Sequence, residues 1–195
     1  RREVLFRAAS GNIARLVFER FASLHDQHVA VQRLQIVAVD GSPAIRVESA
    51  LDGSVTNAGV RHWAANMTVV ADGNLIGLEA AAAQSGYVVG VASQLVTPFE
   101  MKSVAEGERP RTSVAEFTLQ HGDAVTFDKF TAIYTSRDTG FAGQTQPLAA
   151  AQEKTGEAVR YSYATLLAAH QDEWAKYWET SDVRIEGDEE CQLAM

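Results

Sequence analysis

The sequence predicts a mainly β protein: an antiparallel β-sandwich over residues 1–140, followed by a helical linker over residues 141–195. Two observations support this division. Segments with period-two hydrophobic alternation recur between Gly, Asp, Asn and Pro residues through about Asp138, and no amphipathic helix interrupts them. Near Gly140 the composition changes to Ala, Leu, Gln, Glu and Lys, which favour helix. Short strands at such regular intervals are typical of a sandwich.

The first strands are expected within residues 5–40, on either side of the connection SLHDQH. There the side chains of Val17 and Phe21 point to one face of the strand and those of Leu16 and Phe18 to the other, so we expect both faces to be buried at least in part. The further expected strands are AIRVESAL, MTVVA, LIGLEAAAA, YVVGVASQL, SVAEFTLQ and AVTFDKFTAIYTS. The sequence ADGN, at residues 71–74, predicts a hairpin turn.

Gly156 is expected to divide the helical region into a short helix and a longer one from about Glu157 to Glu179. In the longer helix, successive aromatic or apolar residues are separated by 4, 3, 4 and 4 positions. They are Tyr163, Leu167, His170, Trp174 and Trp178. This spacing places them on one face, which we expect to be buried. Packing is the more frequent role of such aromatic residues, although they could also form a sugar-stacking platform.

Charge and composition exclude several classes of function. The net charge of -8 argues against a nucleic-acid binder and against binding to anionic membranes. The single cysteine, Cys191, cannot form an internal disulfide, which favours a reducing, cytoplasmic setting. No apolar run approaches the roughly 18 residues of a membrane-spanning helix, and no secretion signal is recognisable. We therefore expect a cytoplasmic protein without nucleic-acid or membrane partners.

The segment HDQH offers two imidazoles and a carboxylate, from His25, His28 and Asp26, as a candidate metal site. Without a third ligand of known geometry these are too few and too unspecific. We expect instead a loop whose polar groups cap neighbouring strands.

A second group, Glu48, Asp52 and Asn57, includes the paired carboxylates that a glycosidase needs. Both carboxylates lie on the polar face of an alternating strand, where solvation is the usual role. Cys191 lies in an acidic segment that disfavours a thiolate, and no nucleophile elbow or phosphate-binding glycine loop is present. The sequon at Asn66 carries little meaning without a secretion signal. We expect no catalytic residue, no cofactor and no metal in this chain.

Four motifs in order along the chain resemble glycoside hydrolase family 65. They are the strand end Arg20-Phe-x-Ser23-Leu, the segment RVESALDGSVTNAG, the segment FDKFTAIYTSRD from Phe127 to Asp138, and the pattern His170-xxx-Trp174-xxx-Trp178-xxx-Asp182-Val-x-Ile185-x-Gly187-Asp188-xxx-Gln192. The last pattern is similar to the linker that enters the catalytic domain of that family. The sequence departs from the family pattern at Cys191 and Leu193, where Ala and Gln are expected.

The resemblance implies a parent enzyme with an N-terminal sandwich of the galactose-mutarotase-like supersandwich type, a helical linker, an α/α-barrel catalytic domain and a small C-terminal β-domain. On this basis the chain holds most of the sandwich, N-terminally incomplete, and its linker, while the barrel with its catalytic residues is absent. The family comprises inverting phosphorylases of maltose, trehalose, kojibiose or nigerose, and some hydrolases. In inverting phosphorolysis an acid protonates the departing glycosidic oxygen while inorganic phosphate attacks the anomeric carbon, giving β-glucose 1-phosphate.

The resemblance also implies a role for the end of the chain in interdomain packing. The residues concerned are His170, Trp174, Trp178, Asp182, Asp188 and Gln192. The implied partners of the parent are an α-glucosyl disaccharide and inorganic phosphate, with a homodimer as a further expectation. Two alternatives stay open: the same domain of an α-glucoside hydrolase such as a trehalase, or a carbohydrate-binding module, for which Trp63 and scattered Tyr and Phe residues are available.

Overall fold

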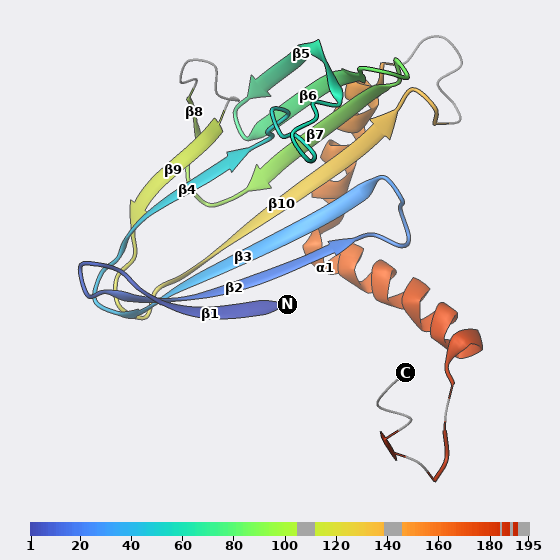
Figure 1. The fold of residues 1–195 in the computed structure, drawn as a ribbon. Helices are drawn as coiled ribbons and strands as arrows, with labels where there is room; N and C mark the ends of the chain where they lie inside the picture. The colour runs from blue at the N-terminus through green and yellow to red at the C-terminus, as the bar shows by residue number, and fades with distance from the viewer. Residues whose placement is uncertain (105–111, 139–145, 184, 188, 191–195) are drawn as a thin grey trace.

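A computed structural model describes residues 1–104, 112–138, 146–183, 185–187 and 189–190. Within these residues the chain forms strands followed by one long helix (Figure 1). The strands are β1 (Arg2–Arg7), β2 (Ile13–Ala22), β3 (Val29–Asp40), β4 (Ala44–Ala50), β5 (Trp63–Asp72), β6 (Leu75–Ala82), β7 (Val88–Val96), β8 (Lys102–Val104), β9 (Thr112–Thr118) and β10 (Ala124–Thr135). The helix is α1 (Pro147–Ser181).

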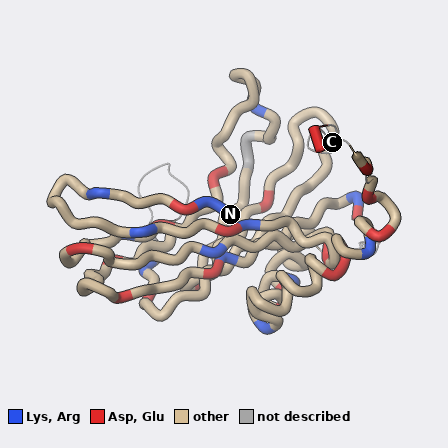
Figure 2. The backbone as a smooth tube through the Cα atoms, turned by 90° about the horizontal axis from the view of Figure 1, so that it is seen from below, with Lys and Arg blue, Asp and Glu red and all other residues tan. Residues whose placement is uncertain are grey.

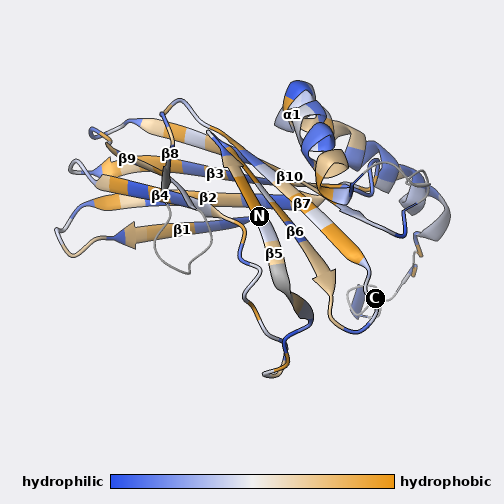
Figure 3. Cartoon of the chain, turned by 90° about the horizontal axis from the view of Figure 1, so that it is seen from above, coloured by the Kyte–Doolittle hydropathy of each residue, from blue (hydrophilic) through white to orange (hydrophobic). Residues whose placement is uncertain are grey.

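The strands form two antiparallel sheets, which confirms the predicted fold class. The larger sheet has the order β1-β2-β3-β10-β7-β6-β5, and the smaller one has the order β4-β9-β8. Hydrophobic and hydrophilic bands alternate along the strands (Figure 3), as expected where successive side chains point to opposite faces. The larger sheet is curled, the smaller sheet faces its concave side, and α1 packs on its other side against β7, β10, β6 and β3.

The core between the sheets is built from alternate residues of the larger sheet and from the inner face of the smaller one. Its buried members are Ala14, Ile36, Ala38, Leu95, Met101, Ala115, Leu119, Val125 and Phe127. Phe99 and Phe117 stack with ring centroids 4.0 Å apart, and both lie against Phe127, at 6.1 and 5.8 Å. This aromatic cluster joins the two sheets, because Phe117 belongs to β9 and Phe127 to β10.

A second core lies between the larger sheet and α1. Its buried members are Val29, Val31, Phe130, Ala158, Tyr163 and Leu166. Next to it, Ala92, Ala132 and Ala151 are completely buried, and their small side chains let the helix approach the sheet closely. The buried hydroxyl of Thr155 donates a hydrogen bond to the carbonyl oxygen of Ala92 at 3.1 Å or of Ala151 at 2.8 Å.

The turn between β5 and β6 is the hairpin predicted at residues 71–74, with Gly73 at φ +54°. The strand β8 was not predicted, because three residues are too short to show a period. The structure also corrects the prediction for the helix. Gly156 lies inside α1, and the interruption is at Ser162, whose φ and ψ of 71° and 160° are not helical. Packing on the sheet outweighs the roughly 1 kcal/mol by which Gly disfavours helix.

We expect Gly156→Ala to stabilise the protein by about 0.5–1 kcal/mol, because Ala loses less backbone entropy in a helix. The position has room for a methyl group: the nearest atom to a Cβ built there is Nη1 of Arg160, 3.8 Å away. Chemical denaturation measures the change in the free energy of unfolding. A decrease would show that the helix needs glycine at this position.

Candidate interdomain surface

The predicted aromatic face of α1 begins on the sheet. Tyr163 is buried, and its ring meets that of Phe21 edge-on, with centroids 5.9 Å apart. The guanidinium of Arg33 lies 3.6 Å from the centre of the Tyr163 ring and donates two hydrogen bonds to the carboxylate of Asp128, at 2.6 and 2.7 Å. Burial raises the pKa of the Tyr163 hydroxyl, and nearby Glu19 adds to the effect. Arg33 and Asp128 were missed in the sequence analysis. Each is a charged residue among the apolar residues that share its face of the strand, which could have marked it.

His170 is the next point of attachment. Its Nδ1 accepts a hydrogen bond from the backbone N–H of Leu24 at 3.1 Å, and its ring stacks on Phe21 with centroids 5.0 Å apart. The imidazole therefore ties the second half of α1 to the end of β2 and the connection after it.

Beyond His170 the helix leaves the sheet (Figure 1). Trp174 and Trp178 stack at a centroid distance of 6.2 Å, and Tyr177 lies 6.1 Å from Trp174. Their exposed fractions are 43%, 57% and 57% for Trp174, Trp178 and Tyr177. We call these three residues the aromatic surface. Tyr163 is buried, as expected of this face, whereas both tryptophans are exposed in this chain, because the helix runs past the sheet beyond His170. Their expected packing on another domain stays a prediction.

A groove of about 520 Å³ runs beside this face. Its apolar lining includes Phe21, Leu167, His170, Trp174 and Trp178, and its polar lining includes Arg1, Glu19 and Arg20. An apolar groove with charged groups at its rim can receive side chains of another protein domain, and a stacked indole pair can also hold a sugar ring.

The remaining predicted packing residues lie at or after the end of the helix. Asp182 follows α1, and its backbone N–H donates to the carbonyl oxygen of Trp178 at 3.0 Å. Gly187 has φ +86°, a turn conformation that favours glycine. Asp188 and Gln192 lie outside the described residues, as does Cys191.

The connection between β2 and β3 holds the helix by charged groups. Nζ of Lys154 lies 3.1 Å from Asp26 and 2.7 Å from Glu157, and Nδ1 of His25 lies 3.7 Å from Glu173. Nδ1 of His28 lies 2.9 Å from the Ile133 carbonyl oxygen. The three candidate metal ligands, His25, Asp26 and His28, are therefore engaged with protein partners. In the described ranges, no group of three or more potential metal ligands is found.

Lys154→Met should reduce the free energy of unfolding near neutral pH, and the loss should shrink as the solution is acidified. The hydrogen bond from Lys154 lowers the pKa of Glu157 from its usual 4.5. A carboxylate with a lowered pKa stabilises the fold above its unfolded pKa, and this contribution is lost as pH falls through the folded pKa. Denaturant titrations between about pH 7 and pH 3 measure this convergence.

Lys176→Met is the matched control, because Lys176 makes an ion pair of the same i,i+3 spacing and 2.7 Å length with Glu173. The side chain of Lys176 is 64% exposed, against 23% for Lys154, so solvent weakens its pair more. Equal effects of the two substitutions at every pH would contradict the role of Lys154 as an anchor.

The candidate carboxylates Glu48 and Asp52 have structural partners. Arg46 donates hydrogen bonds of 2.6 Å to both Glu48 and Glu116 on the outer face of the smaller sheet. Asp52 accepts hydrogen bonds from the hydroxyl and the backbone N–H of Ser54, which lower the pKa of its carboxyl. A general acid needs a raised pKa, so the environment of Asp52 does not favour that role.

The other candidate positions lie in the same region. Asn57 and Val60 form an isolated β-bridge that closes a tight turn, with Ala58 at φ 49°. Trp63 is half-buried at the start of β5, and Asn66 lies within this strand. Acidic and basic residues are interspersed along the chain (Figure 2). None of the helical residues described here provides a stretch long and apolar enough to cross a membrane.

Comparison with known proteins places this domain. The profile of the glycosyl hydrolase family 65 N-terminal domain matches residues 1–177. A kojibiose phosphorylase of Halothermothrix orenii is 29% identical over 205 residues, covering 100% of this chain and 26% of that protein. An alpha,alpha-trehalose phosphorylase of Thermoanaerobacter brockii is 25% identical over 206 residues, covering 98% of this chain and 26% of that protein.

A solved structure of a candidate kojibiose phosphorylase from the human microbiome has the same fold. Its TM-score is 0.79 at 19% sequence identity, covering 92% of this chain and 23% of that one. The chain thus spans about a quarter of the length of these three relatives.

Proposed function

The chain belongs to glycosyl hydrolase family 65 as an N-terminal domain, and from this premise we propose that it is the non-catalytic sandwich of an inverting α-glucoside phosphorylase. Its helix presents the aromatic surface to the catalytic domain of the same enzyme. The observation that carries this proposal is the exposure of Trp174 and Trp178 at the end of an otherwise anchored helix. Large exposed aromatic clusters mark interaction sites.

The proposed reaction of the whole enzyme converts an α-glucosyl disaccharide and inorganic phosphate into β-glucose 1-phosphate and a free sugar. Relatives named kojibiose, trehalose and nigerose phosphorylase support this reaction class. In it the C–O bond of the glucoside breaks, a carboxylic acid gives its proton to the departing oxygen, and a phosphate oxygen forms the new bond from the opposite face. No side chain of this domain is assigned to these steps. Its contribution is to support the catalytic domain and the pocket rim.

The anchoring described above suits this role. Tyr163 and His170 fix the first part of the aromatic face to the larger sheet, with the contacts to Phe21, Leu24 and Arg33 already described. The aromatic surface is thereby held in one orientation before it meets a partner. Preorganisation of this kind reduces the entropy lost on docking.

A carbohydrate-binding role is the second candidate, since the stacked indoles of Trp174 and Trp178 resemble a platform for a sugar ring. The two roles make opposite demands on these rings. A docking surface is covered in the whole enzyme, whereas a sugar platform stays open to solvent.

The first experiment is an assay of the full-length protein with maltose, trehalose, kojibiose and nigerose, with and without inorganic phosphate. Phosphate-dependent release of glucose 1-phosphate is the expected result, and the 195-residue chain should be inactive under the same conditions. Release of free glucose without phosphate would identify a hydrolase. Turnover by the chain alone would refute the non-catalytic role.

Sugar binding is tested separately by titrating the four disaccharides into the full-length protein and its Trp174→Ala variant. Binding that the variant loses, with the reaction otherwise intact, would favour the carbohydrate-binding role. The cytoplasmic location and the homodimer remain predictions.

A further inference from the structure

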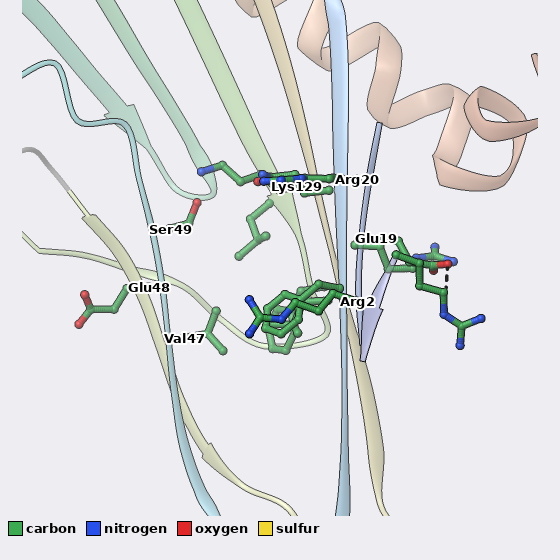
Figure 4. Close-up of a pocket in the computed structure, with 14 residues that line it drawn as sticks. Arg2, Glu19, Arg20, Val47, Glu48, Ser49 and Lys129 are labelled. Atoms are coloured by element: carbon green, nitrogen blue, oxygen red, sulfur yellow. Dashed lines mark ion pairs between the residues drawn. The ribbon is translucent and has the colours of Figure 1, made fainter. Parts of the chain in front are cut away.

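A second cavity, of about 580 Å³, lies on the concave side of the larger sheet, next to β4. The larger sheet lines it with residues of β1, β2, β3, β7 and β10, and the smaller sheet with Val47, Glu48 and Ser49 of β4. Figure 4 shows this space open between the two sheets. The groove beside the aromatic surface lies on the helix side of the larger sheet, and Arg1, Glu19 and Arg20 line both spaces.

Three cationic side chains point into the cavity. Arg2, Arg20 and Lys129 extend from the larger sheet toward β4, whereas Glu48 points to the far side of β4 and Glu19 lies on the opposite side of the larger sheet (Figure 4). Nζ of Lys129 donates a hydrogen bond to the Ala50 carbonyl oxygen at 3.1 Å. Among the residues that the structure describes, no ion pair joins any of the three cations to a carboxylate. Burial lowers the pKa of Lys129.

Apolar side chains lie on the same face. Phe18 is 41% exposed and lines the cavity opposite Arg2 in the β1–β2 register. Phe6 is 55% exposed and pairs across the strands with Ala14, which belongs to the core between the sheets. Phe6 therefore lies on the concave face of the larger sheet. Leu95 and Phe127 form the floor. The cavity therefore combines positive charge with an uncovered apolar surface.

The edge of β4 adjoins this surface. Within the described part of the chain, β4 pairs with β9 alone and is an edge of the smaller sheet. The smaller sheet covers only part of a concave face built from β1, β2, β3 and β10. A strand added to β4 would lie about 4.8 Å from it and run over that uncovered part, since sheets in a sandwich stack about 10 Å apart.

We propose that the free edge of β4 and the concave face beside it receive an extended segment of the same polypeptide from outside these 195 residues. The segment pairs with β4 through its backbone. Its side chains on the sheet-facing side include carboxylates, which pair with Arg2 and Arg20, and apolar groups, which cover Phe6 and Phe18. Alternation along an added strand supplies both kinds, and backbone pairing supplies affinity. The relatives are about four times longer than the part matched here, so such an enzyme has chain enough to provide the segment.

Hydrogen–deuterium exchange on the full-length protein tests the pairing. An antiparallel edge strand leaves alternate amides unpaired. We expect all amides of residues 44–50 to be protected, the alternate ones exchanging about tenfold or more slower than those of the exposed turn at residues 54–61. Rapid exchange of alternate β4 amides would overturn the proposal. Protection that disappears on dilution would also overturn it, because the occupant would then be a second copy.

A charge-reversal pair tests the side-chain chemistry. Arg20→Glu should raise exchange at β4 about tenfold by removing a cation and adding repulsion. Arg15→Glu is the matched control, because Arg15 is also exposed on β2 but has the opposite parity to Arg20, so it lies on the other face of the sheet, where it donates a hydrogen bond to Glu3. Equal responses to the two substitutions would contradict the assigned charge complementarity.

If Arg20→Glu impairs folding, a cysteine-labelling experiment provides a second test of whether the cavity is covered. Gln32 is exposed in the cavity and stands in register with both Arg20 and Lys129. Gln32→Cys in the full-length protein should react with a maleimide about tenfold or more slower than His121→Cys, at an exposed turn. Mass spectrometry of the labelled peptides separates these sites from other cysteines. Equal labelling rates would show that the cavity is open and would overturn the proposal.

Discussion

Replacing Trp174 and Trp178 together with Ala should destabilise the full-length protein by about 2 kcal/mol per ring, if the aromatic surface packs on another domain. A fully buried aromatic side chain removes about 150–250 Å² from water. In the chain described here the two rings are still 43% and 57% exposed, so about half of that area is left to be covered by a partner. Burial of this remainder yields the estimate, at about 25 cal/mol per Å².

The measurement is the thermal or denaturant midpoint of the full-length protein, combined with limited proteolysis after the end of α1. We expect a lower midpoint and faster cleavage in the double variant, because the helix would lose its contact with the catalytic domain. Tyr87→Ala is the control, since Tyr87 is 46% exposed and lies outside the aromatic surface. Changes no larger than those of the control would show that the tryptophans face solvent in the whole enzyme.

Gly90→Ala should destabilise the domain by about 2–3 kcal/mol, because the start of α1 leaves no room for a side chain. Gly90 is buried in β7 beneath Pro147 and Leu148. A Cβ built at Gly90 would clash with three backbone atoms: the Leu148 nitrogen, the Pro147 carbonyl carbon and the Leu148 Cα, the last at a distance of 2.6 Å. Backbone atoms cannot rotate away as a flexible side chain does, so the helix would have to move off the sheet.

Chemical denaturation measures this change, with Gly156→Ala as the internal comparison. The two substitutions add the same methyl group, yet the space around them differs: backbone atoms surround Gly90, whereas a Cβ at Gly156 lies 3.8 Å from Arg160. We therefore expect effects of opposite sign. A Gly90→Ala variant as stable as the original protein would mean that α1 starts farther from the sheet.

The strands were predictable because their signal is local. In β10, Val125 and Phe127 alternate with Asp128 and Phe130 in the manner of a strand covered on both faces, and the structure buries these apolar residues between two sheets or beneath the helix. The hairpin at Gly73 was equally predictable, because a positive φ selects glycine whatever its surroundings. The family, too, could be identified from short motifs spread along the chain.

The position of the helix interruption was not predictable, since local propensity favours a break at Gly156 and the structure has it at Ser162. A serine at φ 71° is held there by the contacts on either side, with Ala158 packed on the sheet and His170 bound to Leu24. The exposure of Trp174 and Trp178 follows from the end of the helix running past the sheet beyond His170, and not from their spacing.

The sequence by itself determined the fold class, most strand positions and the common face of the aromatic residues, because periodicity and turn chemistry act between near neighbours. Tertiary structure alone decided which part of that face is buried, and it brought Arg33 to Asp128 and set Arg20 and Lys129 in register on either side of Gln32. Strand order and helix direction set those distances. They depend on contacts between residues far apart in the chain, which no local pattern records.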